Sequence, residues 1–128
     1  MEGLLLFGHG ARDPEWARPF LAVAARIHAE RPTLPVALAY LEFMQPDFET
    51  AAATLVATGC TRVHILPLFL GVGGHVRKDV PALVERLQTR FGAAVDWQLH
   101  PPVGDAEPVS RAITEVALST LTTLVEKT

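Results

Sequence analysis

The sequence predicts an α/β fold, a three-layer sandwich in which helices cover a four-stranded parallel sheet. Short apolar runs, typical of strands buried on both faces, alternate along the chain with longer segments of helical periodicity. The connections between them are short, as in right-handed strand–helix–strand crossovers. The 128 residues suit one domain, residues 1–128, and 49% of them are apolar, which is enough for a buried core.

The first strand and helix follow directly from local signals. Residues 3–7 form an apolar run that predicts the first strand. Asp13 is suited to cap a helix with Pro14 at its first position, and Arg31 ends that helix. Pro19 lies inside this segment, so the helix either starts later or bends there.

The next signals predict a strand, a helix and a third strand. Residues 36–41 form the second strand. The second helix follows Pro46 and Asp47 and stops at Gly59, a residue type that often ends helices. Residues 62–67 form the third strand.

The last part of the chain repeats the pattern. We expect Asp79 to cap the third helix and Gly92 to end it, before a fourth strand at residues 95–99. The last helix follows Asp105 or Glu107. Its expected apolar face consists of Val109, Ile113, Val116 and Leu124.

Composition excludes several classes of protein. The formal net charge is −3 and no run of Lys or Arg stands out, so we expect neither nucleic acid nor membrane as a partner. Cys60 is the only cysteine, which excludes a disulfide framework, and we interpret it as a small buried residue. The N-terminal apolar run is too short for a signal peptide or a membrane span, so a cytoplasmic location is expected.

A histidine or an acid follows each predicted strand. The four residues, in strand order, are His9, Glu42, His75 and His100. The carboxyl ends of parallel strands meet at one edge of a sheet, and ligands bind there. The sequence therefore predicts a site at this edge. His28 falls on a helix and His64 within a strand, so we interpret both as structural.

Glycines surround two of these histidines. They are Gly8 and Gly10 around His9, and Gly73 and Gly74 before His75. A single histidine at a strand end is often only hydrogen-bonded to a loop carbonyl. Two glycine-flanked histidines at one edge instead indicate function, because glycine lets a large ligand approach the backbone and the ring.

Glu42 is the only charged residue in residues 37–46, so it is either a solvated acid or one kept for a partner. Two histidines and a carboxylate suit a divalent first-row metal ion with open coordination positions. The helix-borne metal motifs His-x-x-Glu and His-Glu-x-x-His are absent from the sequence. The cations Arg12, Arg77 and Lys78 border the same edge, either as ordinary surface residues or as contacts to substrate carboxylates.

Three stretches resemble blocks of the CbiX/SirB-type sirohydrochlorin chelatases, the class II chelatases that need no ATP. They are LLLFGHGARDP at residues 4–14, YLEFMQPD at 40–47 and ILPLFLGVGGHVRKDVPAL at 65–83. The resemblance runs in order through nearly the whole chain and is weakest in the last helix. The length resembles the short, single-domain form of the family.

This resemblance implies insertion of a divalent metal into sirohydrochlorin without ATP, for cobalamin or sirohaem biosynthesis. His9 and His75 match the family's metal-binding, catalytic histidines, and Glu42 matches the acid beside them, as third ligand or proton acceptor. Cobalt is the expected metal, with iron or nickel as alternatives, and no cofactor beyond this substrate ion is expected. His100 has no clear counterpart. The expected substrate-binding residues are Gly8, Gly10, Arg12, Gly73, Gly74, Arg77 and Lys78.

A tetrapyrrole is wide and needs protein on both of its faces. One small domain covers only one face, so we expect a homodimer.

The alternative functions from other classes of protein are weaker. A non-catalytic carrier of metal or tetrapyrrole fits the same residues. A histidine phosphatase needs an Arg-His-Gly motif, and Gly8 stands where its arginine belongs. A nucleotide-binding module is disfavoured, because the glycines at 71–74 lack both phosphate-binding spacings.

Overall fold

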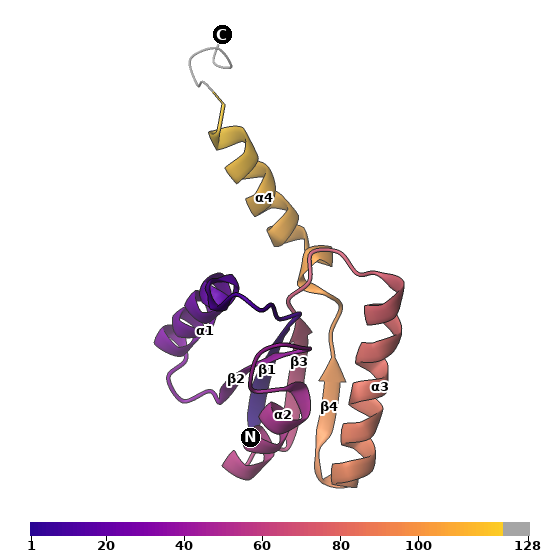
Figure 1. Ribbon diagram of the computed structural model, residues 1–128. Coiled ribbons are helices and arrows are strands. Elements are labelled where there is room, and N and C mark those ends of the chain that lie inside the picture. The colour runs from indigo at the N-terminus through magenta and orange to yellow at the C-terminus, as the bar shows by residue number, and fades with distance from the viewer. Residues whose placement is uncertain (122–128) are drawn as a thin grey trace.

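Four parallel strands form the centre of the structure. The structure is a computed structural model that describes residues 1–121, and for His75 it describes only the backbone. Every strand is followed by a helix, as the sequence predicts (Figure 1). The strands are β1 (Glu2–Gly8), β2 (Val36–Tyr40), β3 (Arg62–Pro67) and β4 (Asp96–Leu99). The helices are α1 (Arg18–Glu30), α2 (Phe48–Thr58), α3 (Gly74–Phe91) and α4 (Glu107–Ser119), with short 3-10 helices at Pro14–Ala17, Gly92–Ala94 and Val103–Asp105.

The strand order is β2-β1-β3-β4, and every neighbouring pair is parallel. The chain first moves from β1 to β2 on one side, and then crosses back to place β3 on the other side of β1. The strand order therefore reverses between β1 and β3. In open α/β sheets this reversal opens a crevice at the carboxyl ends of the strands, where ligands bind.

Helices cover both faces of the sheet, which confirms the three layers. On one face, α2 and α3 pack over the fully buried Leu5, Phe7 and Ile65. On the other face, α1 lies against β2 (Figure 1), and Trp16 from the preceding 3-10 helix packs against Tyr40. The central strand β1 is apolar because both of its faces are covered, whereas only Trp97 of the edge strand β4 is buried.

Most predicted helix ends are confirmed. Asp47 caps α2 by accepting a 2.8 Å hydrogen bond from the backbone N–H of Thr50. Gly59 ends α2 in the left-handed conformation, with φ 112°. The effect of Pro19 is also as predicted. Asp13 begins only a 3-10 helix, and α1 starts later, with Pro19 in its first turn, where the missing N–H costs no hydrogen bond.

The predicted start of the third helix is wrong. Helix α3 begins at Gly74, so Asp79 lies inside the helix and does not cap it. The backbone N–H of Arg77 donates to the carbonyl oxygen of Gly73 at 3.1 Å, which closes the first turn earlier. Val76 and Val80 are one turn apart and both pack on the core, so burial extends the helix toward its N-terminus.

Helix α4 forms as predicted but packs differently. Its cap position is Ala106, and neither Asp105 nor Glu107 caps it. The helix extends away from the sheet (Figure 1), and none of its residues is buried. The predicted apolar face is open, with Ile113 50% and Val116 66% exposed, while Leu124 lies outside the described residues. Within residues 1–121, no helix combines the length and hydropathy needed to cross a bilayer.

Candidate functional site

His9 and Glu42 meet at the carboxyl edge of the sheet. His9 directly follows β1, and Glu42 lies two residues beyond the end of β2. The Nε2 atom of His9 lies 3.3 Å from Oε1 of Glu42, and about half of each side chain is exposed, 48% and 49%. Two predicted site residues that are 33 positions apart in the sequence therefore form one pair, open to solvent, at the reversal of strand order.

The backbone fixes this pair. Hydrogen bonds of the β1–β2 ladder continue past both strands, from Leu41 N to Gly8 O at 2.9 Å and from Glu42 N to His9 O at 3.1 Å. Gly10 has φ 93°, and a Cβ atom there would lie 1.9 Å from the carbonyl oxygen of Glu42. Only glycine lets the two loops touch in this way.

The glycines around His9 thus make room for the protein itself. A Cβ atom at Gly8 would lie 3.3 Å from the indole of Trp16, and the space beside Gly10 is taken by Glu42. Beside Gly73 and Gly74 the space is open, since an added Cβ would meet no atom of the described part of the chain within 4 Å. Substrate contact at all four glycines remains a prediction, with open space for it at the second pair.

Arg12 reaches the loop that carries Glu42. Its guanidinium lies 4.7 Å from the ring centroid of Phe43, a cation–π contact. Phe43 has φ 68°, an unusual conformation for a residue with a side chain, and its ring is largely exposed. Such outliers concentrate at functional sites. The turn after β2 thus presents an acid and an aromatic ring, and Arg12 from the loop after β1 adds a cation beside the ring.

The ring of Phe69 packs against the imidazole of His9. This ring is buried and meets the imidazole edge to face, with 6.4 Å between centroids. The backbone N–H of Gly104 donates to the carbonyl oxygen of Phe69 at 2.9 Å. A Cβ atom at Gly104 would lie 2.0 Å from the carbonyl oxygen of Leu70. Sequence reasoning missed Gly104, and its only signal is the turn-like Pro-Pro-Val-Gly context.

His75 lies in the first turn of α3, directly after the open backbone of Gly73 and Gly74. Its side chain lies outside the described residues. Strand β3 lies beside β1, so the loop that leads from β3 to α3 starts from the same edge as His9. The backbone therefore brings the two predicted metal-binding histidines to one edge of the sheet.

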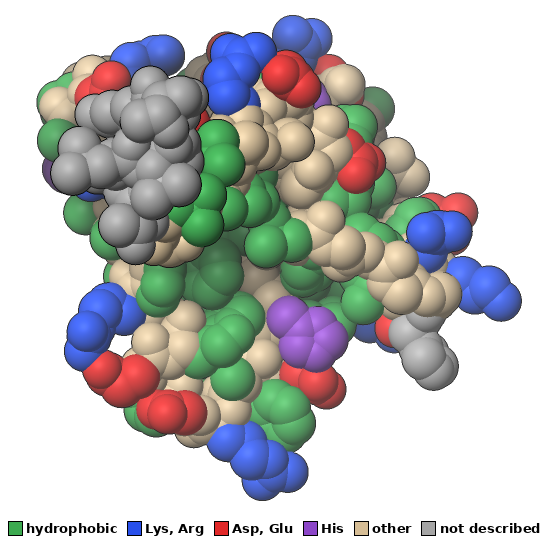
Figure 2. Space-filling view, turned by 90° about the horizontal axis from the view of Figure 1, so that it is seen from above, with side chains coloured by type: hydrophobic (Ala, Val, Ile, Leu, Met, Phe, Trp, Pro, Cys, Tyr) green, Lys and Arg blue, Asp and Glu red, His purple; other side chains and the backbone are tan. Residues whose placement is uncertain are grey.

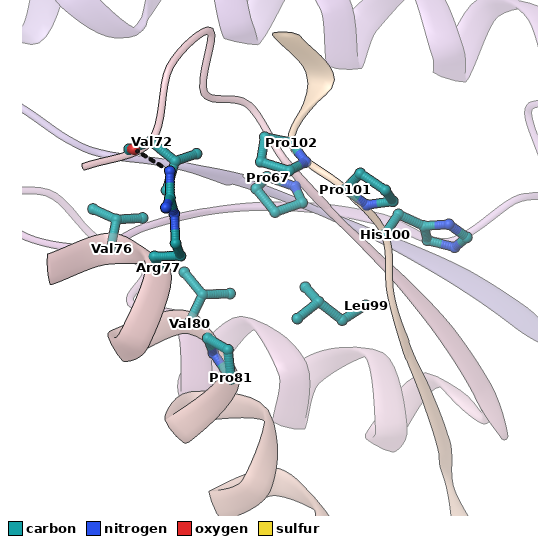
Figure 3. A pocket seen from close by; sticks show the side chains of 10 residues that line it. All are labelled: Pro67, Val72, Val76, Arg77, Val80, Pro81, Leu99, His100, Pro101 and Pro102. Atoms are coloured by element: carbon teal, nitrogen blue, oxygen red, sulfur yellow. Dashed lines mark hydrogen bonds between the residues drawn. The ribbon is translucent and has the colours of Figure 1, made fainter. Parts of the chain in front are cut away.

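Arg77 lies over a pocket of about 300 Å³ beside α3 (Figure 3). Its guanidinium donates to the carbonyl oxygen of Val72 at 3.3 Å. Ten residues line this largely apolar pocket: Pro67, Val72, Val76, Arg77, Val80, Pro81, Leu99, His100, Pro101 and Pro102. In Figure 3 the imidazole of His100 points away from the residues of α3. Lys78, the third predicted cation, is exposed on α3.

The view onto the carboxyl ends of the strands shows a histidine against an acidic side chain (Figure 2). Hydrophobic side chains surround this pair, and most Lys and Arg side chains lie at the periphery.

Burial raises the pKa of Tyr40 and of Cys60, so both stay protonated at neutral pH. Cys60 is buried, as predicted.

The His9–Glu42 spacing suits a shared metal ion. Two ligand atoms about 2.1 Å from one ion lie about 3.0–3.4 Å apart at octahedral to tetrahedral angles. The observed 3.3 Å falls within this range. Among the side chains that the structure describes, no group of three or more His, Cys, Asp or Glu is placed to hold a metal. His75 as a third ligand to this pair stays a prediction, because its side chain lies outside the described residues.

Known proteins resemble the chain over most of its length. It is 27% identical over 118 residues to the sirohydrochlorin cobaltochelatase of Saccharolobus solfataricus, covering 88% of this chain and 91% of that protein. The protein of the same name from Methanococcus maripaludis is 31% identical over 84 residues, covering 66% of this chain and 58% of its own length.

Solved structures share the fold. A putative cobalamin biosynthesis CbiX protein from Marinobacter aquaeolei is 29% identical, with a TM-score of 0.80 and full coverage of both chains. SirB from Bacillus subtilis with Fe3+ is 25% identical, with a TM-score of 0.75 over 89% of this chain and 45% of that longer chain. The CbiX family model matches residues 3–120. The chain belongs to the CbiX family.

Proposed function

We propose that the protein is a sirohydrochlorin chelatase, which inserts a divalent metal ion into the tetrapyrrole without ATP. The observation that carries the proposal is the His9–Glu42 pair, 3.3 Å apart at the reversal of strand order. Membership of the CbiX family and the names of the relatives support it. Cobalt is the metal we propose, with iron or nickel as alternatives, because relatives are named cobaltochelatases and SirB structures contain cobalt or Fe3+.

The metal substrate first binds to His9 and His75, with Glu42 as third ligand or as proton acceptor. Imidazole nitrogen and carboxylate oxygen both suit divalent cobalt and iron. The tetrapyrrole loses two pyrrole N–H protons as the ion enters the ring. A neutral imidazole or the carboxylate of Glu42 accepts them. Four ring nitrogens then replace the protein ligands, which makes the step favourable without nucleotide.

The carboxylates of sirohydrochlorin need cationic partners. We assign Arg12, Arg77 and Lys78 to this role, because Arg12 lies beside the Glu42 loop and the other two lie in the first turns of α3. The open backbone at Gly73 and Gly74 gives the flat macrocycle access to His75. The N-terminus of a helix also attracts anions, and α3 begins at this position.

The working unit we propose is a homodimer, in which each chain is a single domain. The cytoplasmic location of the protein stays a prediction. Helix α4 supports the dimer, because it carries exposed apolar side chains that are unusual for a monomer surface. They are Ile113, Val116 and Leu118, and the exposed Leu121 lies just beyond the end of the helix. A second copy would cover such a surface and provide the second wall for the macrocycle.

An anaerobic insertion assay tests the function. Purified protein is mixed with excess sirohydrochlorin and Co2+, Fe2+ or Ni2+ in parallel, and the absorption spectrum of the macrocycle reports insertion. We expect many turnovers per protein, fastest with cobalt, and a much lower rate for His9→Ala. Insertion that stops at one equivalent would identify a carrier. Rates equal to the protein-free reaction for all three metals would overturn the chelatase assignment.

A further inference from the structure

A second histidine cluster lies on the sheet away from the His9–Glu42 pair. His64 is on β3 and His100 directly follows β4, and Nδ1 of His64 lies 2.9 Å from Nε2 of His100. The other ring nitrogen of His64, Nε2, lies 2.6 Å from Oε2 of Glu2. The three side chains form a continuous chain of contacts across β1, β3 and β4. The proposed insertion chemistry uses none of them.

The cluster is open to solvent. His64 alternates with Val63 and Ile65, which are buried under α2 and α3, so its side chain points to the other face of the sheet. The side chain of His64 is 32% exposed and that of Glu2 is 59% exposed. His100 also lines a shallow pocket with Asp105, which leaves room for water beside its ring.

Hydrogen bonding determines the protonation of the cluster. Oε2 of Glu2 lies 2.6 Å from Nε2 of His64, which is a hydrogen-bond distance. A carboxylate only accepts hydrogen bonds, so the tautomer of His64 that fits this contact carries its proton on Nε2. The lone pair of His64 is then on Nδ1 and points toward His100. This arrangement, a carboxylate that orients a histidine, is typical of metal ligands.

We propose that His64 Nδ1 and His100 Nε2 bind a divalent first-row metal ion, with Glu2 as the orienting carboxylate. Two nitrogen ligands about 2.1 Å from an ion, at right angles, lie about 3.0 Å apart, close to the observed 2.9 Å. His100 binds in the neutral tautomer that carries its proton on Nδ1. Imidazole pairs suit cobalt, nickel and zinc. Water completes the coordination, so the ion binds reversibly.

The backbone holds both ligands in place. Arg62 to Ile65 on β3 pairs in register with Asp96 to Leu99 on β4, which sets His64 opposite Gln98. The backbone N–H of His100 donates to the carbonyl oxygen of Ile65 at 3.0 Å, and Pro101 and Pro102 follow at once. The two rings therefore meet without a change of fold, which lowers the cost of binding an ion.

Cobalt titration without tetrapyrrole tests the site separately from insertion. The parent is the full-length variant His9→Ala/His75→Ala, and its metal-free form is titrated with CoCl2 by calorimetry and visible absorption. We expect one equivalent to bind. Adding His100→Gln should abolish this binding, while adding Glu2→Gln should weaken it about 10–100-fold. His28→Gln is the matched control, because His28 is exposed on α1, and it should change nothing.

Two results would overturn the proposal. One is a folded parent variant that binds no cobalt, and the other is cobalt binding that His100→Gln leaves unchanged. Circular dichroism checks the fold of each variant. If the parent does not fold, the unaltered protein is titrated while the ring signals of its histidines are followed by NMR. Broadening of the His64 and His100 signals supports the site, and unchanged signals at saturating cobalt reject it.

Discussion

Gly10 and Glu42 touch through their backbones, so that a Cβ atom on Gly10 would lie 1.9 Å from the carbonyl oxygen of Glu42. This contact decides where the Glu42 carboxylate lies relative to His9. It also explains a glycine next to His9 without any bound substrate. The geometry of the site therefore depends on a residue that has no side chain, and its replacement makes a sharp test.

We predict that Gly10→Ala disrupts the site. The added methyl group collides with backbone that cannot rotate away, and φ 93° is itself unfavourable for alanine. We expect a loss of stability of about 1–3 kcal/mol in urea unfolding and a large loss of insertion activity. Gly73→Ala is the matched control for stability, since its Cβ would meet no atom of the described residues within 4 Å. Equal stability of the two variants would contradict this explanation.

His9→Ala and His75→Ala should each lower insertion by at least about 100-fold, because each removes a proposed metal ligand and proton acceptor. Both variants should keep the circular dichroism spectrum of the parent protein. His28→Ala, in the last turn of α1, is the control and should retain full activity. If either variant is folded like the parent protein and keeps near-normal turnover, that histidine is not part of the active site.

Glu42→Gln keeps the size of the side chain but removes its charge and its basicity. If Glu42 accepts a proton, the variant should still bind sirohydrochlorin while its turnover falls about 10-fold or more. Fluorescence quenching measures the binding, and the insertion assay measures the rate. Turnover equal to that of the parent protein from about pH 6 to pH 9 would leave Glu42 without a chemical role.

Asp47→Ala should destabilise the fold by about 0.5–2 kcal/mol at neutral pH, because it removes the cap of α2. Hydrogen bonds from the side chain and backbone of Thr50 hold the pKa of Asp47 below its ordinary value of 3.8. A lowered folded pKa stabilises the protein above the unfolded value, and this stabilisation is lost as pH falls through the folded value.

The difference between wild type and Asp47→Ala should therefore be constant above about pH 5 and shrink below about pH 4. Urea unfolding at a series of pH values measures it. Asp47→Asn is the control, because it keeps a capping oxygen but cannot titrate. A wild-type advantage over Asp47→Ala that persists undiminished at about pH 3 would show that the charge of Asp47 is not involved.

The proposed dimer predicts a mass of two chains in light scattering coupled to size exclusion. Val116 is 66% exposed and Ile113 50% exposed on α4, so Ile113→Asp/Val116→Asp should produce a monomer with reduced activity. Glu115→Gln, on the same helix, should leave the dimer intact. A wild-type protein that stays monomeric at micromolar concentration with undiminished specific activity rules the dimer out.

Local sequence determined the secondary structure and one half of the site. Short apolar runs and their alternation with helical segments located all four strands. Asp47 and Gly59 marked the ends of α2, because caps depend on neighbouring backbone alone. His9 was placed at a strand end because the apolar run that precedes it is also a local signal. The start of α3 was missed because Asp79-Val80-Pro81 imitates a helix start, whereas burial of Val76 on the core favours an earlier turn.

Only the tertiary structure decided which residues meet. The strand order β2-β1-β3-β4 places β2 and β3 on either side of His9, and no local pattern encodes that order. Side-chain contacts across strands follow from it, including His9 with Glu42 and His64 with His100. The sequence by itself determined which chemical groups stand at the strand ends. Long-range pairing determined their distances, because those depend on register between strands that are far apart in the chain.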